Sequence, residues 1–331
     1  MRKTLYIILC LLTAISLCSS CQENKEAIKK PYVVFVIGDE EYRSEESMPM
    51  LGQLLQKCFD VDVTYCHSVD TSGIIDPNRL DHIEGLEALE SADLMVMFTR
   101  FRALPEEELQ YIIDYAESGK PMVGFRTSTH AFLYKQDSSL FHMNNDWPSK
   151  VFGQQWITHH GHFDDGNNPL TSVSFNPKTS DHVILRGVND FDAYSWLYHV
   201  DGGKWNLHGD SKPLLVGKAL KSNHEVNNRL EEYPIQNPVA WTKSYTGKSG
   251  KTSRVFFTTL GHPYDFKLET MRRLSIQGIL WALGKEEIIP EKGVNCPLDF
   301  EYDPNNSGFG NKYKPGLKPI NKTILVKPTQ F

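Results

Sequence analysis

The sequence predicts an α/β fold, a doubly wound and mostly parallel sheet with a β-rich extension. From Pro31 to Phe132, short apolar runs alternate with amphipathic helical stretches. After Trp147, aromatic residues, Gly, Asn and Asp become frequent, and short β-like runs lie between turn signals. The alternation is typical of a parallel sheet covered by helices, and the later runs predict additional strands.

The first half is expected to supply the parallel sheet. Four apolar runs predict its strands: 32–37, 61–66, 93–99 and 121–125. A helix is expected through residue 58, with Ser44 as its cap. A second spans 105–119, with Pro105 at its start, acidic residues in its first turn and Gly119 past its end. The stretch FRTSTHAF, Phe125 to Phe132, is expected to open the next helix.

The second half is expected to add strands and return to the sheet. Three β-like runs cover 170–175, 193–200 and 213–220, and the segments 237–245 and 253–260 flank TGKSGKT as a hairpin. Leu, Ile and Trp periodicity predicts a last helix closed by Gly284. These elements predict one domain over 31–285, followed by an extended tail, 286–331, draped over its surface.

The N-terminus reads as an export signal. Arg2 and Lys3 precede an apolar stretch that is too short to span a bilayer comfortably, and small residues precede Cys21. The pattern resembles a bacterial lipoprotein signal over residues 1–20, with Cys21 lipidated and 21–30 as a tether; a plain cleaved signal is the alternative. We therefore expect a lipid-anchored protein of the bacterial cell envelope, periplasmic or surface-exposed, that meets the membrane through this anchor.

Charge and cysteine usage exclude some function classes. The formal net charge is −6, and loss of residues 1–20 removes Arg2, Lys3 and no acid, which leaves −8. An acidic protein of this kind argues against nucleic acid as a partner. The spacing of Cys58, Cys66 and Cys296 matches no zinc knuckle or redox pair. Cys58 and Cys66 are expected to be buried apolar residues, and the pairing of Cys296, in the loop-rich tail, stays open.

Charged and histidine side chains follow four of the predicted strands. Ligands of open α/β sheets bind outside the carboxyl ends of the strands, so these side chains are the candidates for a site. They are Asp39, Glu40, Glu41 and Arg43 after the first strand, Arg100 and Arg102 after the third, Arg126 and His130 after the fourth, and His262 and Asp265 after the hairpin. Local ion pairing is the alternative explanation for the acidic cluster after the first strand.

Arg126 occupies the most informative of these positions. A strand, a sharp turn and a helix form the geometry of a nucleophile elbow, whose turn residue projects from the top of the sheet. Arginine cannot be a nucleophile or base at ordinary pH, but it can hold a carboxylate, a sugar oxygen or an enolate. The alternative is a structural ion pair with Asp39 or Glu41.

Histidines provide the candidate acid/base and metal-binding groups. His130 is a candidate acid or base facing the crevice, unless it is hydrogen-bonded within its helix. In WITHHGHFDDGN, His160 and His162 would share one face of an extended segment and His159 the other, so the pair is a candidate metal site with a nearby carboxylate. The sequence assigns no cofactor with certainty, and a divalent metal is compatible with this cluster; a hydrogen-bonding scaffold is the alternative.

Several collinear motifs resemble the ThuA-like (trehalose-utilisation) family, which is related in fold to class I glutamine amidotransferases. They are EYRSEESMPML, RFRALPEEELQYIIDYAESGKPMVGFRTSTHAF, HHGH and VFFTTLGHPYDFKLETMRRLSIQGILWALG. The resemblance covers about residues 31–285 and implies a flavodoxin-like sheet and a link to carbohydrate utilisation, including sugars oxidised to 3-keto forms. Arg126 stands where amidotransferases carry their catalytic cysteine, and Cys66 is the sole near miss, so glutamine hydrolysis is not expected.

Three function hypotheses follow. The leading one is a carbohydrate-processing lipoprotein, a lyase, isomerase or hydrolase, that acts on a small-molecule glycoside or 3-keto-sugar by acid/base chemistry with enediolate stabilisation. His130, His160 or His262 would be the base, and Arg126 with Arg100 the cation. Glu41, Arg43, Arg102 and Asp265 are the candidate substrate-binding residues. A non-catalytic carbohydrate-binding lipoprotein and a metal-dependent hydrolase are the alternatives, and the sequence does not predict an oligomeric state.

Overall fold

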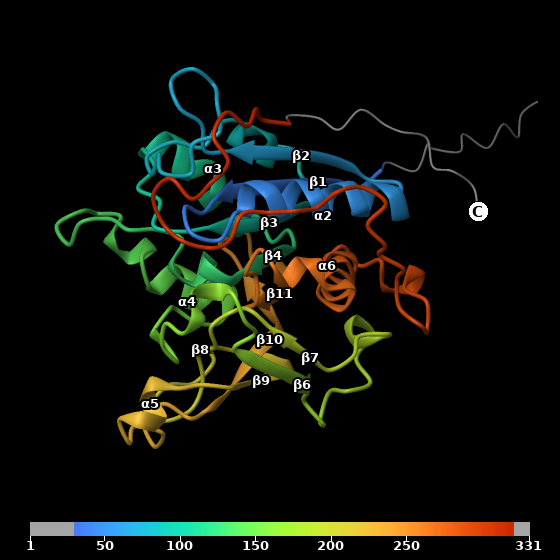
Figure 1. The fold of residues 1–331 in the computed structure, drawn as a ribbon. Coiled ribbons are helices and arrows are strands. Elements are labelled where there is room, and N and C mark those ends of the chain that lie inside the picture. The colour runs from blue at the N-terminus through green and yellow to red at the C-terminus, as the bar shows by residue number, and fades with distance from the viewer. Residues whose placement is uncertain (1–29, 321–331) are drawn as a thin grey trace, which may run out of the picture. The chain divides into compact units, whose positions relative to one another are not determined.

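A computed structural model describes residues 30–320, apart from the side chain of Asp165. A nine-stranded mixed sheet runs through this part of the chain in the order β2-β1-β3-β4-β11-β10-β9-β6-β7 (Figure 1). Residues 1–29, with Cys21, and 321–331 lie outside the described residues, so the signal and the lipid anchor stay predictions. Among the described helices, none has the length and apolar character needed to cross a membrane.

The parallel half of the sheet has the flavodoxin-like strand order, which confirms the predicted α/β class. Its strands are β1 (Tyr32–Gly38), β2 (Asp62–His67), β3 (Leu94–Thr99), β4 (Met122–Phe125) and β11 (Thr252–Thr258). All neighbouring pairs among them are parallel. Along β1, Val33 and Phe35 pack into one hydrophobic cluster and Val34 and Val36 into another, so the sheet is buried on both faces.

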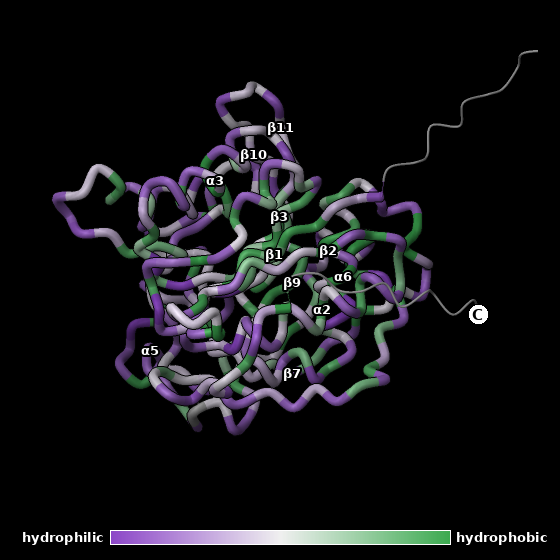
Figure 2. Tube along the Cα trace, turned by 90° about the horizontal axis from the view of Figure 1, so that it is seen from above, coloured by the Kyte–Doolittle hydropathy of each residue, from purple (hydrophilic) through white to green (hydrophobic). Residues whose placement is uncertain are grey.

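Helices cover both faces of the parallel strands. On one face lie α2 (Ser44–Cys58) and α6 (Glu269–Ala282), which contact each other. On the other lie α3 (Glu106–Glu117) and the short α4 (Asp146–Phe152). Figure 2 shows the hydrophobic residues concentrated in the central strands and the hydrophilic ones in the outer loops.

The β-rich half continues the same sheet with antiparallel strands. They are β10 (Gln236–Thr246), β9 (Lys212–Ala219), β6 (Thr171–Phe175) and β7 (Phe191–Ala193). The predicted hairpin is confirmed, since β10 and β11 pair around their turn. After β9 comes a four-residue helix, α5 (Asn223–Val226). The run 193–200 is not one strand, because its first residue ends β7 and its later residues form a separate strand, β8 (Tyr198–His199). Strand β8 pairs with β5 (Thr158–His159) in a second, two-stranded sheet. The break occurs because the Asp265 carboxylate accepts the N–H groups of Tyr194 and Ser195 at 2.6 and 3.3 Å.

Two local expectations differ from the structure. Ser44 is not the cap of α2: its Oγ accepts the N–H of Asp39 at 3.1 Å, and Arg43 precedes the helix with φ of 55°. The residues Arg126–His130 form a single 3₁₀ helix, η2, rather than the start of a longer helix. The chain then pairs with the loop after β3, where Phe101 and Arg102 donate to the carbonyls of His130 and Ala131.

The three described cysteines are free thiols, with Cys66 and Cys296 buried and Cys58 half-buried. After α6 comes a 3₁₀ turn, η7 (Glu286–Ile288), and residues 289–320 then run without helix or strand. In Figure 1 this segment, coloured red, crosses in front of β1 and β3. Gly308 donates to the carbonyl of Glu41 at 2.8 Å, and Ile75 donates to that of Leu317 at 2.9 Å. The tail thereby reaches the ends of β1 and β2.

Candidate functional site

A cavity of about 200 Å³ opens at the carboxyl ends of β1, β3 and β4. Five polar side chains line it: Glu41, Arg100, His130, His159 and His162. Six aromatic side chains complete the lining: Tyr42, Phe101, Trp156, Trp196, Tyr198 and Phe309. This is the position expected for the ligand site of an open α/β sheet.

A turn built on Asp39 presents the acidic residues after β1. Its Oδ1 accepts the N–H groups of Glu41 and Tyr42 at 2.7 and 2.6 Å, and its Oδ2 accepts the hydroxyl of Thr127. These bonds tie the end of β1 to the residues after β4 and hold Glu40 and Glu41 in place. The dense charge after β1 is therefore organised by backbone hydrogen bonds.

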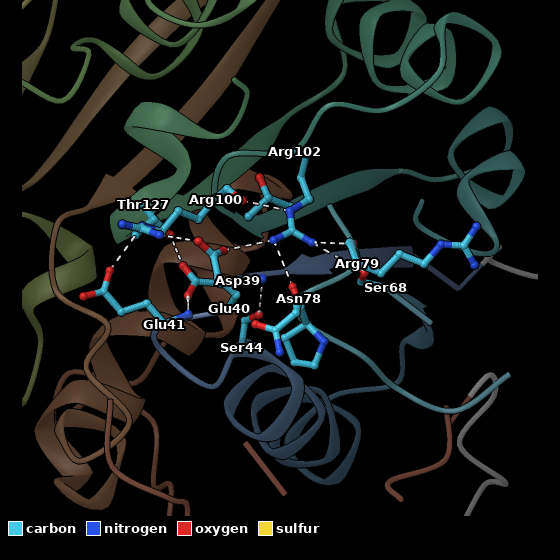
Figure 3. Close-up of polar contacts among 12 residues, drawn as sticks. Asp39, Glu40, Glu41, Ser44, Ser68, Asn78, Arg79, Arg100, Arg102 and Thr127 are labelled. Atoms are coloured by element: carbon cyan, nitrogen blue, oxygen red, sulfur yellow. Dashed lines mark hydrogen bonds and ion pairs between the residues drawn. The ribbon is translucent and has the colours of Figure 1, made fainter. Parts of the chain in front are cut away.

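Two arginines pair with these carboxylates (Figure 3). The Glu40 carboxylate contacts Arg100 through one oxygen and Arg102 through the other, the latter at 3.0 Å. The Nε of Arg100 also lies 3.1 Å from Oε2 of Glu41. Arg102 is fully buried and outside the cavity, so of the two arginines Arg100 alone meets a ligand there.

Glu41 is the carboxyl group best placed to exchange a proton. It is 5% exposed, and burial raises its pKa to about 7, helped by Asp39 and opposed by Arg100. A buried group whose pKa lies near the working pH can both take and return a proton. Glu41 can therefore act as a general base and a general acid near neutral pH.

Arg126 lies beneath the cavity rather than in its lining. Its φ is 39°, in the left-handed region, as expected for a tight turn after a strand. Its guanidinium donates to the Thr259 carbonyl and the Tyr42 hydroxyl, each at 2.9 Å. It also lies over the rings of Tyr42 and Tyr198, 4.1 and 4.5 Å from their centroids. Arg126 thus fixes the two tyrosines and adds positive charge from below.

His130 offers an acceptor to the cavity. Thr129 donates its hydroxyl hydrogen to the carbonyl of Arg126 at 3.2 Å, so its oxygen is left to accept from Nδ1 of His130 at 3.1 Å. This assigns the ring hydrogen to Nδ1 and leaves a lone pair on Nε2. Burial, with Arg100 and Arg126 nearby, holds the pKa of His130 well below its usual range, so the ring is neutral.

His159 has the opposite tautomer. Its Nδ1 accepts the N–H of Gly161 at 3.0 Å, so Nε2 carries the hydrogen. Burial, followed by the charges of His162 and Arg126, lowers the pKa of His159 to about 3. His130 therefore offers the cavity an acceptor, and His159 offers it a donor.

His160 and His162 do not share a face, unlike the expectation for an extended segment. His162 lies against His159 and Trp196, with ring centroids 4.3 and 4.7 Å apart. His160 points away from the cavity and bonds Ser222 at 2.8 Å. Gly161, with φ of 107°, breaks the alternation between them. Within residues 30–320, no group of three His, Cys, Asp or Glu side chains is arranged to hold a metal ion.

His262, Asp265 and Arg43 lie near the cavity but outside its lining. His262 is buried, accepts from the N–H of Tyr264 at 3.1 Å and contacts the Ser307 hydroxyl at 3.0 Å. Asp265 bonds the hydroxyl of Ser195 and the N–H groups of Gly261 and His262. Arg43 donates to the carbonyls of Glu40 and Gly308. These three residues hold the loops around the site together.

Several lining residues were not among the sequence candidates. His159 lies with His162 in the cavity, whereas the extended pattern placed the two on opposite faces. The aromatic residues Trp156, Trp196, Tyr198 and Phe309 are not among the candidates that follow the strands. The end of β1 did give a signal, because Tyr42 follows the acidic cluster directly. Phe309 gave none, since it comes from a tail without periodicity.

Comparison with known proteins gives a family and a fold. Residues 33–282 match the family ThuA, described as trehalose utilisation. A ThuA-like protein from Parabacteroides merdae ATCC 43184 has a similar crystal structure, with 18% identity, a TM-score of 0.51, and coverage of 86% of this chain and 99% of that chain. A ThuA-like protein from Bacteroides uniformis ATCC 8492 has 15% identity, a TM-score of 0.48, and coverage of 77% and 92%. No curated protein matches. At this identity the first structure supports the fold alone.

Proposed function

Because this chain belongs to the ThuA family, described as trehalose utilisation, we propose that its cavity binds one sugar unit and carries out acid/base chemistry on it. The substrate class is a glycoside or its 3-keto derivative. The family assigns the chain to carbohydrate metabolism in general, and the residues of the cavity suggest the reaction. Glu41, Arg100, His130 and His159 are the residues to which we assign roles.

The observation that carries the proposal is the Glu41 carboxyl group. Its pKa of about 7, its burial and its contact with Arg100 join a proton-exchanging group to a fixed cation in one small cavity. A keto-sugar needs a base for the proton beside its carbonyl and a cation for the oxygen that becomes negative. Here the base and the cation, Glu41 and Arg100, form an ion pair with each other.

The cavity walls suit a sugar ring. Trp156 and Trp196 line the cavity beside His159, and their centroids lie 6.3 and 5.7 Å from that of its ring. Flat aromatic rings pack against the apolar C–H faces of sugars, and polar groups between them bind hydroxyls. The Nε2 lone pair of His130 would accept one hydroxyl, and the Nε2–H of His159 would donate to another oxygen.

The proposed reaction begins with loss of the proton next to the keto group. Glu41, as carboxylate, takes that proton, and the C–H electron pair moves to form an enediolate oxygen that Arg100 stabilises. Glu41 then returns the proton to the glycosidic oxygen as the bond from the sugar carbon to that oxygen breaks. The products are an unsaturated keto-sugar and a free alcohol, and addition of water to the former completes a net hydrolysis.

A second candidate is carbohydrate binding without turnover. Arg100 already contacts both Glu40 and Glu41, so the charged groups are paired before a ligand arrives. Pairing with a cation makes a carboxylate a weaker base than it would be unpaired, which favours binding over proton abstraction. This candidate predicts heat of binding with no product.

Turnover assays separate these candidates. The purified protein would be incubated with 3-keto-trehalose, a 3-keto-glucoside and the parent glycosides, with products followed by mass spectrometry. We expect product from a keto-glycoside, with Glu41→Gln reducing the rate by about a hundredfold or more and Glu107→Gln, an exposed control on α3, leaving it unchanged. No product from any substrate, with or without divalent metal, would contradict the enzyme proposal.

The metal-dependent hydrolase is the third candidate from the sequence. It predicts a stoichiometric divalent ion in the purified protein and activity that a chelator removes. Elemental analysis of protein purified without added metal tests it, and a metal content far below one ion per chain would eliminate it.

We also propose that the chain is held in the bacterial envelope by a lipid on Cys21. The signal-like sequence of residues 1–20 supports this proposal. Expression in a bacterium with a labelled fatty acid should label the wild-type chain in the membrane fraction, and Cys21→Ser should remain unlabelled. Equal labelling of both would refute it.

A further inference from the structure

A second cavity, of about 240 Å³, lies between the start of α2, the end of β2 and the C-terminal tail. It shares no lining residue with the first cavity. Its polar groups include Glu45 from α2 and His67 from β2. Its apolar walls include Met50 and Ile75, and the tail adds Phe300 and Tyr302.

Three neighbouring side chains of this region carry polar atoms without hydrogen-bond partners. These are Nε and Nη1 of Arg43, both carboxylate oxygens of Glu45 and both ring nitrogens of His67, which find no partner within residues 30–320. The three residues are only 0, 5 and 1% exposed, respectively. Arg43 and Glu45 do form an ion pair, but their closest atoms are 3.9 Å apart, too far for a hydrogen bond.

Buried polar atoms of this kind are normally hydrogen-bonded, because an unmet donor or acceptor costs free energy. Glu45 and His67 line the cavity, so a molecule inside it could meet their atoms. At the same cavity the carboxylate of Glu46 already has partners: it accepts the N–H of Asn305 at 3.2 Å and pairs with Lys314 at 2.6 Å. Of the three side chains with unmet atoms, Glu45 and His67 line the cavity, and Arg43 lies behind Glu45 as its ion-pair partner.

This cavity suits a neutral ligand with hydroxyl groups. Burial lowers the pKa of His67 to about 4, so its neutral ring presents one donor and one acceptor. Burial raises the pKa of Glu45 to about 7, opposed by Arg43, so near neutral pH its carboxyl group can accept or donate a hydrogen bond. The charge of Glu46 is balanced by Lys314. A hydroxyl both donates and accepts, and the C–H face of a ring can pack on Phe300 and Tyr302.

We propose that this second cavity binds a neutral polyhydroxylated molecule of one ring, a monosaccharide or a cyclic polyol, through Glu45 and His67. The occupant would also contact the tail, which continues from Tyr302 to Phe309 in the first cavity. The proposal uses residues other than those of the proposed reaction, and it stands whether or not the first cavity is catalytic.

Calorimetry on the full chain tests this site. D-glucose and myo-inositol are the neutral probes, with n-butylammonium chloride and inorganic phosphate as charged ones. The Trp156→Ala variant serves as the background that weakens the first cavity. In it, we expect one polyol site that Glu45→Gln and His67→Phe each weaken by about tenfold or more. Glu46→Gln is the matched control, since its oxygens have other partners, and should change affinity less than twofold, by about 0.4 kcal/mol.

Three results would overturn the proposal. One is the absence of binding of either polyol in the Trp156→Ala background. Another is binding that neither Glu45→Gln nor His67→Phe weakens, while circular dichroism shows both variants folded. The third is Glu45-dependent binding of butylammonium or phosphate in place of the polyols. If one substitution prevents folding, the other still decides the outcome. None of these results depends on turnover, so they leave the proposed function to its own assay.

Discussion

Glu41→Gln should stabilise the folded protein at neutral and alkaline pH. Glu41 is buried, and its pKa is raised from an ordinary 4.5 to about 7. Between these two values the folded chain keeps its proton while the unfolded chain releases it. The folded state then binds more protons, so this carboxyl makes stability fall as pH rises through that window. Glutamine keeps the shape but cannot ionise, so the variant escapes this loss.

The expected size follows from the two pKa values. Each pKa unit corresponds to 1.36 kcal/mol, so a rise from 4.5 to about 7 corresponds to about 3 kcal/mol. The variant should match the wild type near pH 4.5, apart from a constant offset for the amide, and gain about 3 kcal/mol relative to it by pH 7.5. Glu45, whose pKa burial also raises to about 7, is present in both proteins and cancels in the difference.

Urea unfolding at several pH values between 4.5 and 8.5 measures this difference. The control is Glu107→Gln, which is exposed and should show a difference that does not depend on pH. A Glu41→Gln difference that stays flat with pH would mean that Glu41 ionises normally. A difference that grows as pH falls would mean that Arg100 stabilises the carboxylate more than burial destabilises it. Either result would contradict a raised pKa for Glu41 in the folded protein.

Four other substitutions have defined outcomes. Trp156→Ala, at a residue 37% exposed, should weaken sugar binding by about tenfold in calorimetry with little loss of stability; unchanged affinity would remove Trp156 from the site. Arg126→Met should lower the urea-derived free energy of unfolding by about 3 kcal/mol, because it leaves the Thr259 carbonyl and Tyr42 hydroxyl unpartnered; a loss below about 1 kcal/mol would be inconsistent with this role. Gly161→Ala requires a side chain at φ of 107° and 2.8 Å from the Phe163 ring, so thermal unfolding should occur at lower temperature, whereas an unchanged midpoint would show that the loop adapts. Phe309→Ala should raise KM for the sugar more than it lowers kcat, since Phe309 lines the cavity and stacks on Arg100; an effect on kcat alone would argue against it.

The parallel sheet could be predicted because each of its strands is determined by the pattern of neighbouring residues in the sequence. Each strand is a short apolar run, and alternate residues such as Val33 and Val34 bury both faces. The hairpin of β10 and β11 could also be predicted from the sequence, because a turn with two glycines separates two runs of β-forming residues. The length of η2 could not be predicted from its own residues. The helix ends where Phe101 and Arg102, from the loop after β3, donate to the carbonyls of His130 and Ala131.

The position of the site in the fold could be predicted from the sequence, but only some of the residues that line it could. Strand ends pointed to Glu41, Arg100 and His130, which line the cavity. Arg126 came from the same reasoning, yet packing between Tyr42 and Tyr198 buries it below the lining. Periodicity reports only on residues close together in the chain. The packing of Arg126 between Tyr42 and Tyr198, and the position of Phe309 in the cavity, involve residues far apart in the chain and could not be predicted from it. His159 lies on the same side as His162 because Gly161, with φ of 107°, breaks the alternation of an extended segment.

The proposed reaction requires Glu41 to remove a proton from the carbon beside a keto group of a bound sugar. The most direct test is exchange of that proton with solvent: a 3-keto-glucoside is incubated with the protein in heavy water and the recovered sugar is analysed by mass spectrometry. We expect one deuterium per recovered molecule with the wild-type protein and loss of that exchange with Glu41→Gln, while calorimetry shows that the variant still binds the sugar. No deuterium above the protein-free rate, or equal incorporation by both proteins, would contradict it.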